Sequence, residues 1–264
     1  MKFCRVHQEG ESRWGVVEGP PGEEQLARLL RSAPWTLEGN HEGEAVGHRA
    51  LKDLELLAPV EPTKIVCVGR NYREHAEELG NEVPKEPLLF FKPPSSLIGP
   101  GQEIRRPGKL SQRVDYEGEL ALVVGKRCYQ PSEGEDIRQY IFGYTCLNDV
   151  TARDLQNKDG QWTRAKGFDT FCPVGPVMTD EIDPWRGVKV ETRVNGEMRQ
   201  SGNTTQFIFS LDVMMRYIAN AMTLMPGDVI ATGTPKGVGP LQAGDVVEVR
   251  VEGIGCLRNP VADG

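Results

Sequence analysis

Short apolar runs bounded by glycine or proline dominate the hydrophobic pattern of this chain. Such runs are typical of buried strands, because a strand needs only a few residues to cross a core. They lie at residues 64–68, 88–92, 119–124, 140–148, 188–194, 229–232 and 246–251. Asn195-Gly196, just after one of these runs, is the clearest signal in the chain for a tight hairpin.

Helical spacing is confined to a few segments, and the best amphipathic one covers residues 209–223. In it, Phe209, Val213, Tyr217 and Ala221 recur at an interval that predicts one apolar helix face. Shorter helical segments are expected at residues 70–80 and from residue 151 to 156. Many short strands with few helices predict a mainly β (α+β) fold in which the sheet is closed or rolled.

The pattern also predicts two domains. Residues 1–58 read as a small α/β amino-terminal domain: strands at 3–6 and 14–17 around a polar turn, a helix at 24–32 and a strand at 51–57. A proline-containing linker follows, and we expect residues 59–264 to form the main domain.

Composition narrows the functional classes. The 264 residues carry 31 basic and 38 acidic side chains, a net charge of −7, which gives no support for nucleic acid or an anionic membrane as partner. No apolar run approaches the length of a membrane-spanning helix. The six cysteines are scattered without a C-x-x-C pair, as expected for small core residues in a reducing compartment. We therefore expect a cytoplasmic protein.

Three carboxylates stand out against this apolar background. Glu117 and Glu119 precede or begin a strand-like run and, being two apart, project to the same face. Asp149 ends a second run. Buried together, these acids would repel each other unless a cation lies between them, and an all-oxygen donor set favours Mg²⁺ or Mn²⁺, with Ca²⁺ as the alternative. The competing interpretation is a solvated acidic face.

Other polar residues are candidates for catalysis or substrate binding, because of their helical spacing or their apolar neighbours. His75 and Glu78 are three apart, so on a helix the carboxylate can orient the imidazole as a base. Arg153 and Gln156 share a similar spacing after Asp149. Lys166 lies between aromatic and small residues, where an ammonium either finds an anion or has a lowered pKa. A surface His/Glu pair and an exposed loop lysine are the alternatives.

Five spaced motifs, in order, resemble those of the fumarylacetoacetate hydrolase family. They are residues 69–72 with His75 and Glu78, then 115–119, 148–154, 165–169 and 232–239. The resemblance implies a β-roll catalytic domain, a homodimeric assembly and a set of site residues. These are Glu117, Glu119 and Asp149 as metal ligands, His75, Glu78 and Lys166 as catalytic residues, and Arg70, Tyr72, Arg153, Gln156 and Thr234 as substrate-binding residues.

The same resemblance implies a small 2-oxo or 2-hydroxy-dienoic acid as substrate. The leading expectation is an isomerase of 2-hydroxyhepta-2,4-diene-1,7-dioate type in the breakdown of aromatic compounds. An acylpyruvate C–C hydrolase and an oxaloacetate decarboxylase remain open, as does a non-enzymatic, Ca²⁺-stabilised β-scaffold that binds a partner. A nicotinamide enzyme is disfavoured, because no G-x-G-x-x-G follows any expected strand.

Overall fold

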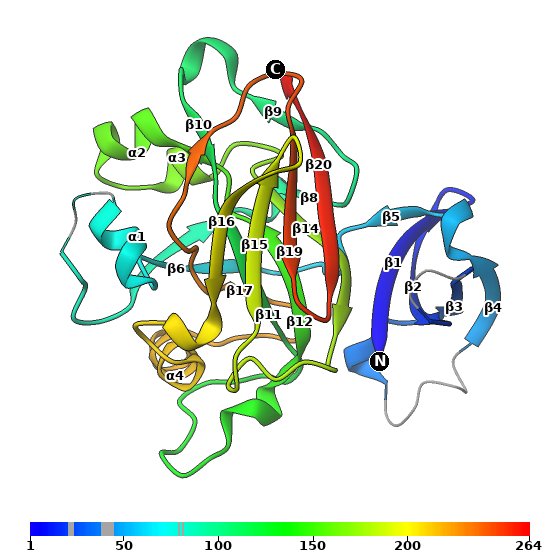
Figure 1. Cartoon of the computed structure of the whole chain (residues 1–264). Helices are drawn as coiled ribbons and strands as arrows, with labels where there is room; N and C mark the ends of the chain where they lie inside the picture. Colours follow the sequence, from blue (N-terminus) through cyan, green and yellow to red (C-terminus); the bar gives the residue numbers. More distant parts are fainter. Residues whose placement is uncertain (21–23, 38–44, 79, 81) are drawn as a thin grey trace.

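The computed structural model describes residues 1–20, 24–37, 45–78, 80 and 82–264, and Figure 1 shows its two parts. Backbone hydrogen bonds join strands of both parts in one large sheet. Neighbouring strands of this sheet follow in the order β4 (Ala45–Ala50), β3 (Leu26–Leu30), β2 (Glu11–Glu18), β1 (Lys2–Gln8), β14 (Cys172–Thr179), β12 (Ile141–Asn148), β11 (Gly118–Val124), β17 (Val229–Ala231), β6 (Ile65–Gly69) and β7 (Leu88–Lys92). Two further strands pair with members of this order: β5 (Glu55–Leu57) pairs with β1, and β8 (Leu97–Ile98) pairs with β14.

Two smaller sheets complete the main domain. The first contains β16 (Glu197–Asn203), β15 (Lys189–Val194), β19 (Val246–Val251), β20 (Gly255–Asp263) and β9 (Ile104–Arg106). The second contains β13 (Thr151–Ala152), β10 (Val114–Tyr116) and β18 (Gly239–Pro240). The expected hairpin at Asn195-Gly196 is confirmed, because Val194 pairs with Glu197 across that turn.

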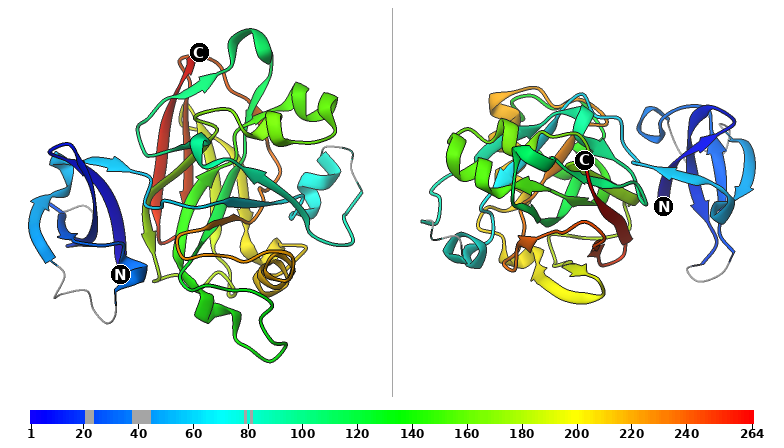
Figure 2. Two further views of the ribbon diagram at one scale, coloured as in Figure 1. Left: turned by 180° about the vertical axis from the view of Figure 1, so that it is seen from behind. Right: turned by 90° about the horizontal axis from the view of Figure 1, so that it is seen from above.

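Helices are short and lie around the sheets (Figure 2). The α-helices are α1 (Arg73–Glu78), α2 (Arg153–Asp159), α3 (Thr163–Lys166) and α4 (Leu211–Ala221). Single turns of 3-10 helix lie at Pro34–Thr36, Leu51–Asp53, Pro94–Ser96, Gly108–Leu110, Ile137–Tyr140 and Thr204–Gln206. The predicted mainly β fold is confirmed.

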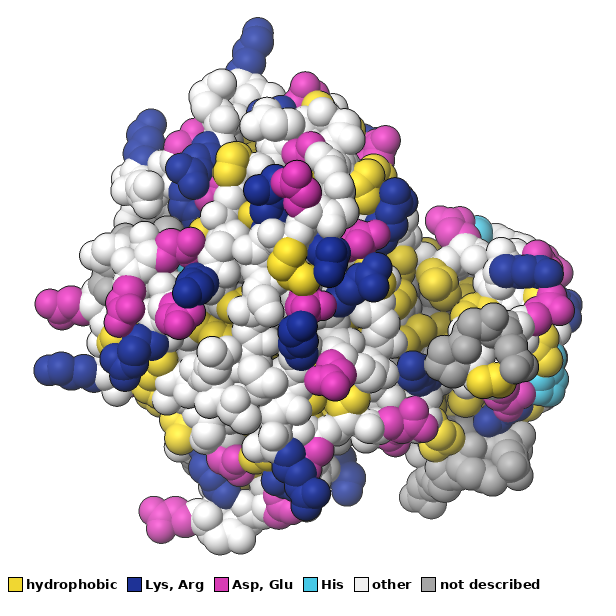
Figure 3. Space-filling view, viewed as in Figure 1, with side chains coloured by type: hydrophobic (Ala, Val, Ile, Leu, Met, Phe, Trp, Pro, Cys, Tyr) yellow, Lys and Arg dark blue, Asp and Glu magenta, His cyan; other side chains and the backbone are white. Residues whose placement is uncertain are grey.

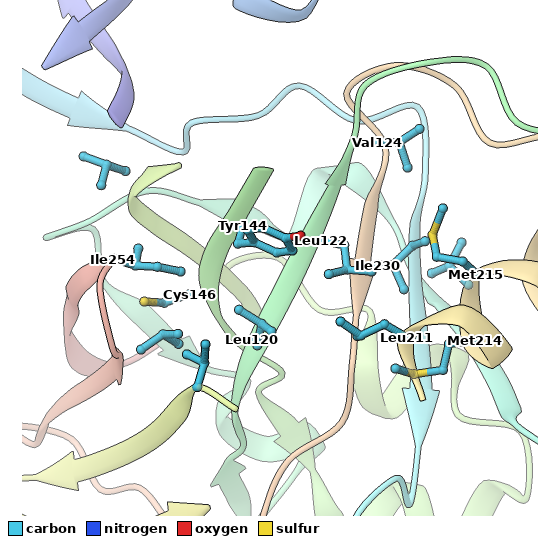
Figure 4. Close-up of a cluster of buried hydrophobic side chains, with 14 of the residues drawn as sticks. Leu120, Leu122, Val124, Tyr144, Cys146, Leu211, Met214, Met215, Ile230 and Ile254 are labelled. Atoms are coloured by element: carbon cyan, nitrogen blue, oxygen red, sulfur yellow. The ribbon is translucent and has the colours of Figure 1, made fainter. Parts of the chain in front are cut away.

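Strand β11 is buried on both faces and organises the core. Leu120 and Leu122 belong to the cluster that includes Ile230 and the buried side of α4 (Figure 4), whereas Ala121 and Val123 belong to the cluster on the other face. This double burial explains why the strand is a continuous apolar run and does not alternate with polar residues.

The apolar face predicted for α4 is wrong. Val213 is 46% exposed, whereas Leu211, Met214 and Ile218 are buried in the core. Ser210 caps the helix by accepting a hydrogen bond from the Val213 amide, so the helix begins later than the pattern suggested. The sequence offers apolar residues on both sides of this helix, and packing against β11 and β17 decides which side is buried.

Two expectations for the amino-terminal segment are also wrong. The segment predicted as a helix at 24–32 contains β3, where Leu30 and Ala27 pair with Trp14 and Val17 of β2, so strand pairing overrides local helical spacing. The strand predicted at 51–57 begins instead as the 3-10 turn Leu51–Asp53 and becomes β5 only afterwards.

Strand β1 joins the amino-terminal part to the main domain. Lys2 and Phe3 pair with Thr179 and Met178 of β14, and Phe3 lies 5.1 Å, centroid to centroid, from Phe142. Figure 3 shows hydrophobic side chains where the two parts meet, and interspersed acidic and basic side chains over the face in view. The division at residue 58 stays a prediction.

The structure also bears on the expectations that the cysteines are unpaired core residues and that the chain has no membrane-spanning helix. All six cysteines are free, and five of them are buried. Within the described residues, no helix has both the length and the apolarity needed to cross a membrane.

Candidate active site

The three predicted carboxylates converge where β10, β11 and β12 meet. Gly118 pairs with Asn148 across β11 and β12, and the Asp149 amide donates to the Glu117 carbonyl at 2.8 Å. One carboxylate oxygen from each of Glu117, Glu119 and Asp149 lies within 4.8 Å of the others, and all three residues are buried. The interpretation of these acids as a solvated face is therefore wrong.

Buried cations already balance part of this charge. The Lys166 ammonium lies 2.8 Å from Glu117 Oε2 and 2.7 Å from Asp149 Oδ2, and Arg153 also forms an ion pair with Glu117. Burial alone would raise the pKa of Glu117, but the neighbouring charges of Lys166 and Arg153 outweigh burial and hold it well below its usual range. Burial would lower the pKa of Lys166, yet Asp149 and Glu117 raise it, so the ammonium stays protonated.

Lys92 was not predicted from the sequence and is fully buried beside Asp149. Its ammonium donates to Asp149 Oδ1 at 2.6 Å and to the Val150 carbonyl at 3.1 Å. The expectation that a cation lies among these acids is thus met in part by two buried ammonium groups, those of Lys92 and Lys166. A lysine at the end of an apolar strand was the available signal, because a buried ammonium requires an anion.

Glu119 differs from the other two acids. Its carboxylate accepts a hydrogen bond from the Gly233 amide at 2.7 Å, and it forms no ion pair within the described residues. Burial, followed by the charges of Asp149 and Glu117, raises its pKa well above the usual value. A cation bound here would relieve that repulsion, and the oxygen-only donor set fits a hard divalent ion.

His75 and Glu78 lie together on α1, but they do not form the expected hydrogen bond. His75 Nδ1 is 3.6 Å from Glu78 Oε2, and both oxygens of Glu78 accept from the Gly237 amide at 3.0 and 3.1 Å. The buried Nδ1 has no hydrogen-bond partner among the described residues. Burial lowers the pKa of the imidazole, so it is neutral at neutral pH.

A cavity of about 690 Å³ connects these groups. Its wall includes the imidazole, the acid triad, Lys166 and a polar and aromatic rim. The lining residues of this rim and floor are Val68, Gly69, Arg70, Leu88, Leu89, Phe90, Arg113, Arg153, Gln156, Asn157, Gly160, Gln161, Trp162, Gly233 and Thr234.

Two of the predicted substrate-binding residues in this wall already have protein partners. Arg153 donates to Asp115 Oδ2 at 2.9 Å and to Gln156, so its charge is largely taken up by the site itself. The Thr234 hydroxyl donates to the Gly118 carbonyl at 2.8 Å and accepts from Gln200. Their roles toward a substrate stay predictions.

Arg70 and Tyr72, the other two predicted substrate-binding residues near β6, lie at different places relative to the cavity. Arg70 lines the cavity, whereas Tyr72 lies outside the described cavity wall, packed edge-on against Phe207. The Tyr72 hydroxyl is buried without a hydrogen-bond partner among the described residues. Burial, with a contribution from the Glu119 charge, raises its pKa, so the phenol stays protonated.

Sequence reasoning missed several residues that support the site. Asp115 is fully buried and bonds both Arg113 and Arg153, and Gln200 accepts from the Gly118 amide. Trp162 forms part of the rim and packs edge-on against Phe90. No periodicity marks these residues, because their contacts join segments far apart in the chain.

Gly118 holds the two glutamates apart at a place with no room for a side chain. A Cβ there would lie 2.0 Å from Thr192 Oγ1 and 3.2 Å from a Val249 methyl carbon. Gly118→Ala is expected to lower the free energy of unfolding by about 1–3 kcal/mol through overpacking, and to weaken metal binding by shifting Glu117 and Glu119. Thermal unfolding and metal titration measure both effects. Gly134→Ala, with open space around its Cβ, is the control, and equal behaviour of the two variants would contradict this prediction.

Family models agree with this architecture. Residues 64–262 match the model described as "Fumarylacetoacetate (FAA) hydrolase C-terminal". The chain belongs to the fumarylacetoacetate hydrolase family. Residues 1–59 match a second model, described as "Rv2993c-like, N-terminal".

Individual relatives of this fumarylacetoacetate hydrolase family member carry several activities in their names. Oxaloacetate tautomerase YisK of Bacillus subtilis is 40% identical over 253 residues, covering 91% of this chain and 83% of that protein. The structure of a 2-hydroxyhepta-2,4-diene-1,7-dioate isomerase from Mycobacterium marinum matches with a TM-score of 0.89 and 40% identity, covering 100% of this chain and 98% of that one. A fumarylpyruvate hydrolase from Pseudomonas aeruginosa, in complex with Mn²⁺ and pyruvate, matches with a TM-score of 0.72 and 30% identity over 78% and 91% of the two chains. Members of the family are thus enzymes, and they bind divalent metals.

Proposed function

We propose that this protein is a divalent-metal-dependent isomerase of 2-oxo and 2-hydroxy-dienoic dicarboxylic acids, of the 2-hydroxyhepta-2,4-diene-1,7-dioate type. The observation that carries the proposal is a neutral, buried imidazole in the same cavity as three convergent carboxylates. A base and a hard-cation site facing one space suit proton transfer next to a 2-oxo group. The similarity to the isomerase of Mycobacterium marinum supports this choice.

Glu117, Glu119 and Asp149 would hold Mg²⁺ or Mn²⁺. When bound, that ion supplies a Lewis acid that lowers the energy of negative charge developing on a 2-oxo oxygen. Lys166 stays cationic in this proposal and lines the same cavity, where its ion pairs with Glu117 and Asp149 position two of the three ligands.

His75 would move the proton. A proton on Nδ1 faces Glu78, 3.6 Å away, which leaves Nε2 as the basic nitrogen of the neutral ring. In isomerisation this nitrogen takes a proton from one position of the substrate and returns it to another. Leu88, Leu89 and Phe90 provide an apolar wall that limits water near the transferred proton.

A second candidate reaction is the tautomerisation of oxaloacetate, favoured by 40% identity to YisK. It uses the same proton transfer on a shorter diacid. C–C hydrolysis of an acylpyruvate and decarboxylation of oxaloacetate remain as further alternatives, and each needs a different step after the enolate forms.

One assay separates these reactions. The protein with Mg²⁺ is offered the dienedioate, an acylpyruvate and oxaloacetate side by side, while ultraviolet absorbance follows the enol and NMR identifies the product. We expect isomerised dienedioate to form fastest, without release of pyruvate or CO₂. Faster cleavage of the acylpyruvate, or CO₂ release as the main reaction, would contradict the isomerase proposal. Tight Ca²⁺ binding with no turnover of any substrate would favour the binding scaffold.

A further inference from the structure

A second hollow opens beside the catalytic cavity and shares part of its wall. It is an open groove of about 910 Å³ between the segment 84–89 and the carboxyl-terminal end of α4. Arg70, Leu88 and Leu89 line both hollows, so the groove continues from the cavity at these three residues. The remaining groove residues are Pro84, Lys85, Glu86, Pro87, Tyr217, Asn220 and Ala221.

Arg70, at this junction, is a cation that the site does not neutralise. Of the arginines and lysine lining the cavity, Arg113, Arg153 and Lys166 each form ion pairs with carboxylates. Within the described residues Arg70 forms none, and its guanidinium lies 5.8 Å from the centroid of the Trp162 ring. That stacking holds the guanidinium at the rim while leaving its N–H groups available to an anion.

The backbone at Arg70 is held in a conformation that ordinary residues avoid. Its φ is 57°, a region that costs a non-glycine residue about 1–2 kcal/mol. The next residue fixes this turn, because the Asn71 side chain donates to the Thr232 carbonyl at 2.9 Å and accepts from the Phe209 amide at 2.8 Å. An arginine kept on a strained and rigid turn indicates a role for its side chain.

The groove beyond Arg70 has a mixed lining that suits an extended acid. Pro84, Pro87 and Ala221 offer apolar surface, and the only carboxylate in its described wall, Glu86, is bonded by Tyr217. Lys85 is exposed there and forms no ion pair within the described part of the chain. The groove wall thus carries two cations, Arg70 and Lys85, and one carboxylate, Glu86.

We propose that this groove binds the distal end of the substrate, and that Arg70 binds its second carboxylate. The inference rests on the proposed function for the position of the 2-oxo acid head in the catalytic cavity. It makes Arg70 a specificity-determining residue that selects dicarboxylates over monocarboxylates. The groove then selects acids with chains longer than that of oxaloacetate.

Equilibrium binding to the Mg²⁺-loaded protein tests the proposal with two stable ligands. 2-Oxoadipate and 2-oxohexanoate share a six-carbon chain and a 2-oxo acid head, and only the first has a terminal carboxylate. The wild type is expected to bind 2-oxoadipate about tenfold more tightly or better, as for a charge-assisted hydrogen bond. Arg70→Gln should reduce this ratio to near one, and Arg70→Lys should restore part of it.

Matched controls separate a specific role from general damage. Arg73→Gln makes the same change at an exposed position nearby and should keep the wild-type ratio. Ala221→Trp, at an exposed groove residue, should weaken 2-oxoadipate binding, whereas Val213→Trp, on an exposed part of the same helix outside the groove, should not. Misfolding would weaken both ligands together and leave the ratio unchanged.

The outcomes also separate this proposal from the proposed function. A wild-type ratio near one, or an unchanged ratio in Arg70→Gln while 2-oxohexanoate still binds as tightly as to the wild type, would overturn the subsite even if the isomerase assay succeeds. Discrimination that depends on Arg70 without any turnover would support the subsite and remove the isomerase reaction.

Discussion

His75→Ala is expected to lower turnover by about 10²- to 10⁴-fold while Mg²⁺ affinity stays close to that of the wild type. The imidazole is the neutral base in the cavity wall, and it is not a member of the acid triad. Single-turnover kinetics and metal titration measure the two effects separately. Unchanged turnover would remove His75 from the mechanism.

The pH profile provides a second measurement of the same role. Because burial lowers the pKa of His75 from its ordinary value of 6.5, the base form persists into mildly acidic solution. We expect the acid limb of kcat/KM to lie below pH 6.5 in the wild type and to disappear with His75→Ala. His48→Ala is the control, since this half-exposed histidine lies on β4, an edge strand in the amino-terminal part of the molecule. An equal loss in both variants would indicate a general effect on folding.

Glu119→Gln is expected to abolish tight metal binding and, in the same molecule, to stabilise the metal-free protein at neutral pH. Glu119 is the triad member whose carboxylate forms no ion pair within the described residues, so an amide there removes buried charge without leaving a cation unpaired. The variant therefore loses a metal ligand, and its metal-free form should have a larger free energy of unfolding than the wild type.

The sign of the pH dependence follows from the raised pKa of Glu119 in the folded protein. Its protonated form contributes stability that is fully present below the unfolded pKa, near 4.3 for a glutamate. That contribution is lost as pH rises from there through the higher folded pKa. Thermal unfolding of the metal-free proteins should thus show a gap between Glu119→Gln and wild type that widens as the pH rises through this window.

An exposed glutamate provides the control for this experiment. Glu133→Gln should change neither metal binding nor the pH dependence of unfolding. A fully occupied metal site in Glu119→Gln would show that the ligand set is wrong. A lower melting temperature than wild type at neutral pH would show that the buried charge is compensated in another way.

Local sequence pattern predicted the elements whose geometry is set by neighbouring residues. The spacing of Glu117 and Glu119 placed both on one face of the chain, and the spacing of His75 and Glu78 placed both on α1. The hairpin at Asn195-Gly196 is similarly local, because Val194 and Glu197 pair directly across its two-residue turn. These features follow from the two-residue and 3.6-residue periods of strands and helices.

Features decided by contacts between distant segments were not predicted. Leu26–Leu30 becomes a strand because β2 and β4 pair with it, and α4 buries the side that meets β11. Lys92 meets Asp149 across 57 positions of the chain. The hydrogen bond expected between His75 and Glu78 fails because the Gly237 amide takes the carboxylate. Each of these features depends on a partner residue that is distant in the sequence, so the pattern of neighbouring residues does not reveal it.

Strand β11 lies between two hydrophobic clusters and also carries Glu119 near its start, so one segment contributes both to the core and to the acid triad. A mutation in this strand therefore faces selection twice, through impaired folding and through displaced carboxylates. The rim formed by Trp162 and the groove beside α4 has no such double role. Relatives that prefer different substrates are accordingly expected to differ first at the cavity rim and in the groove, while the sequence of β11 stays the same.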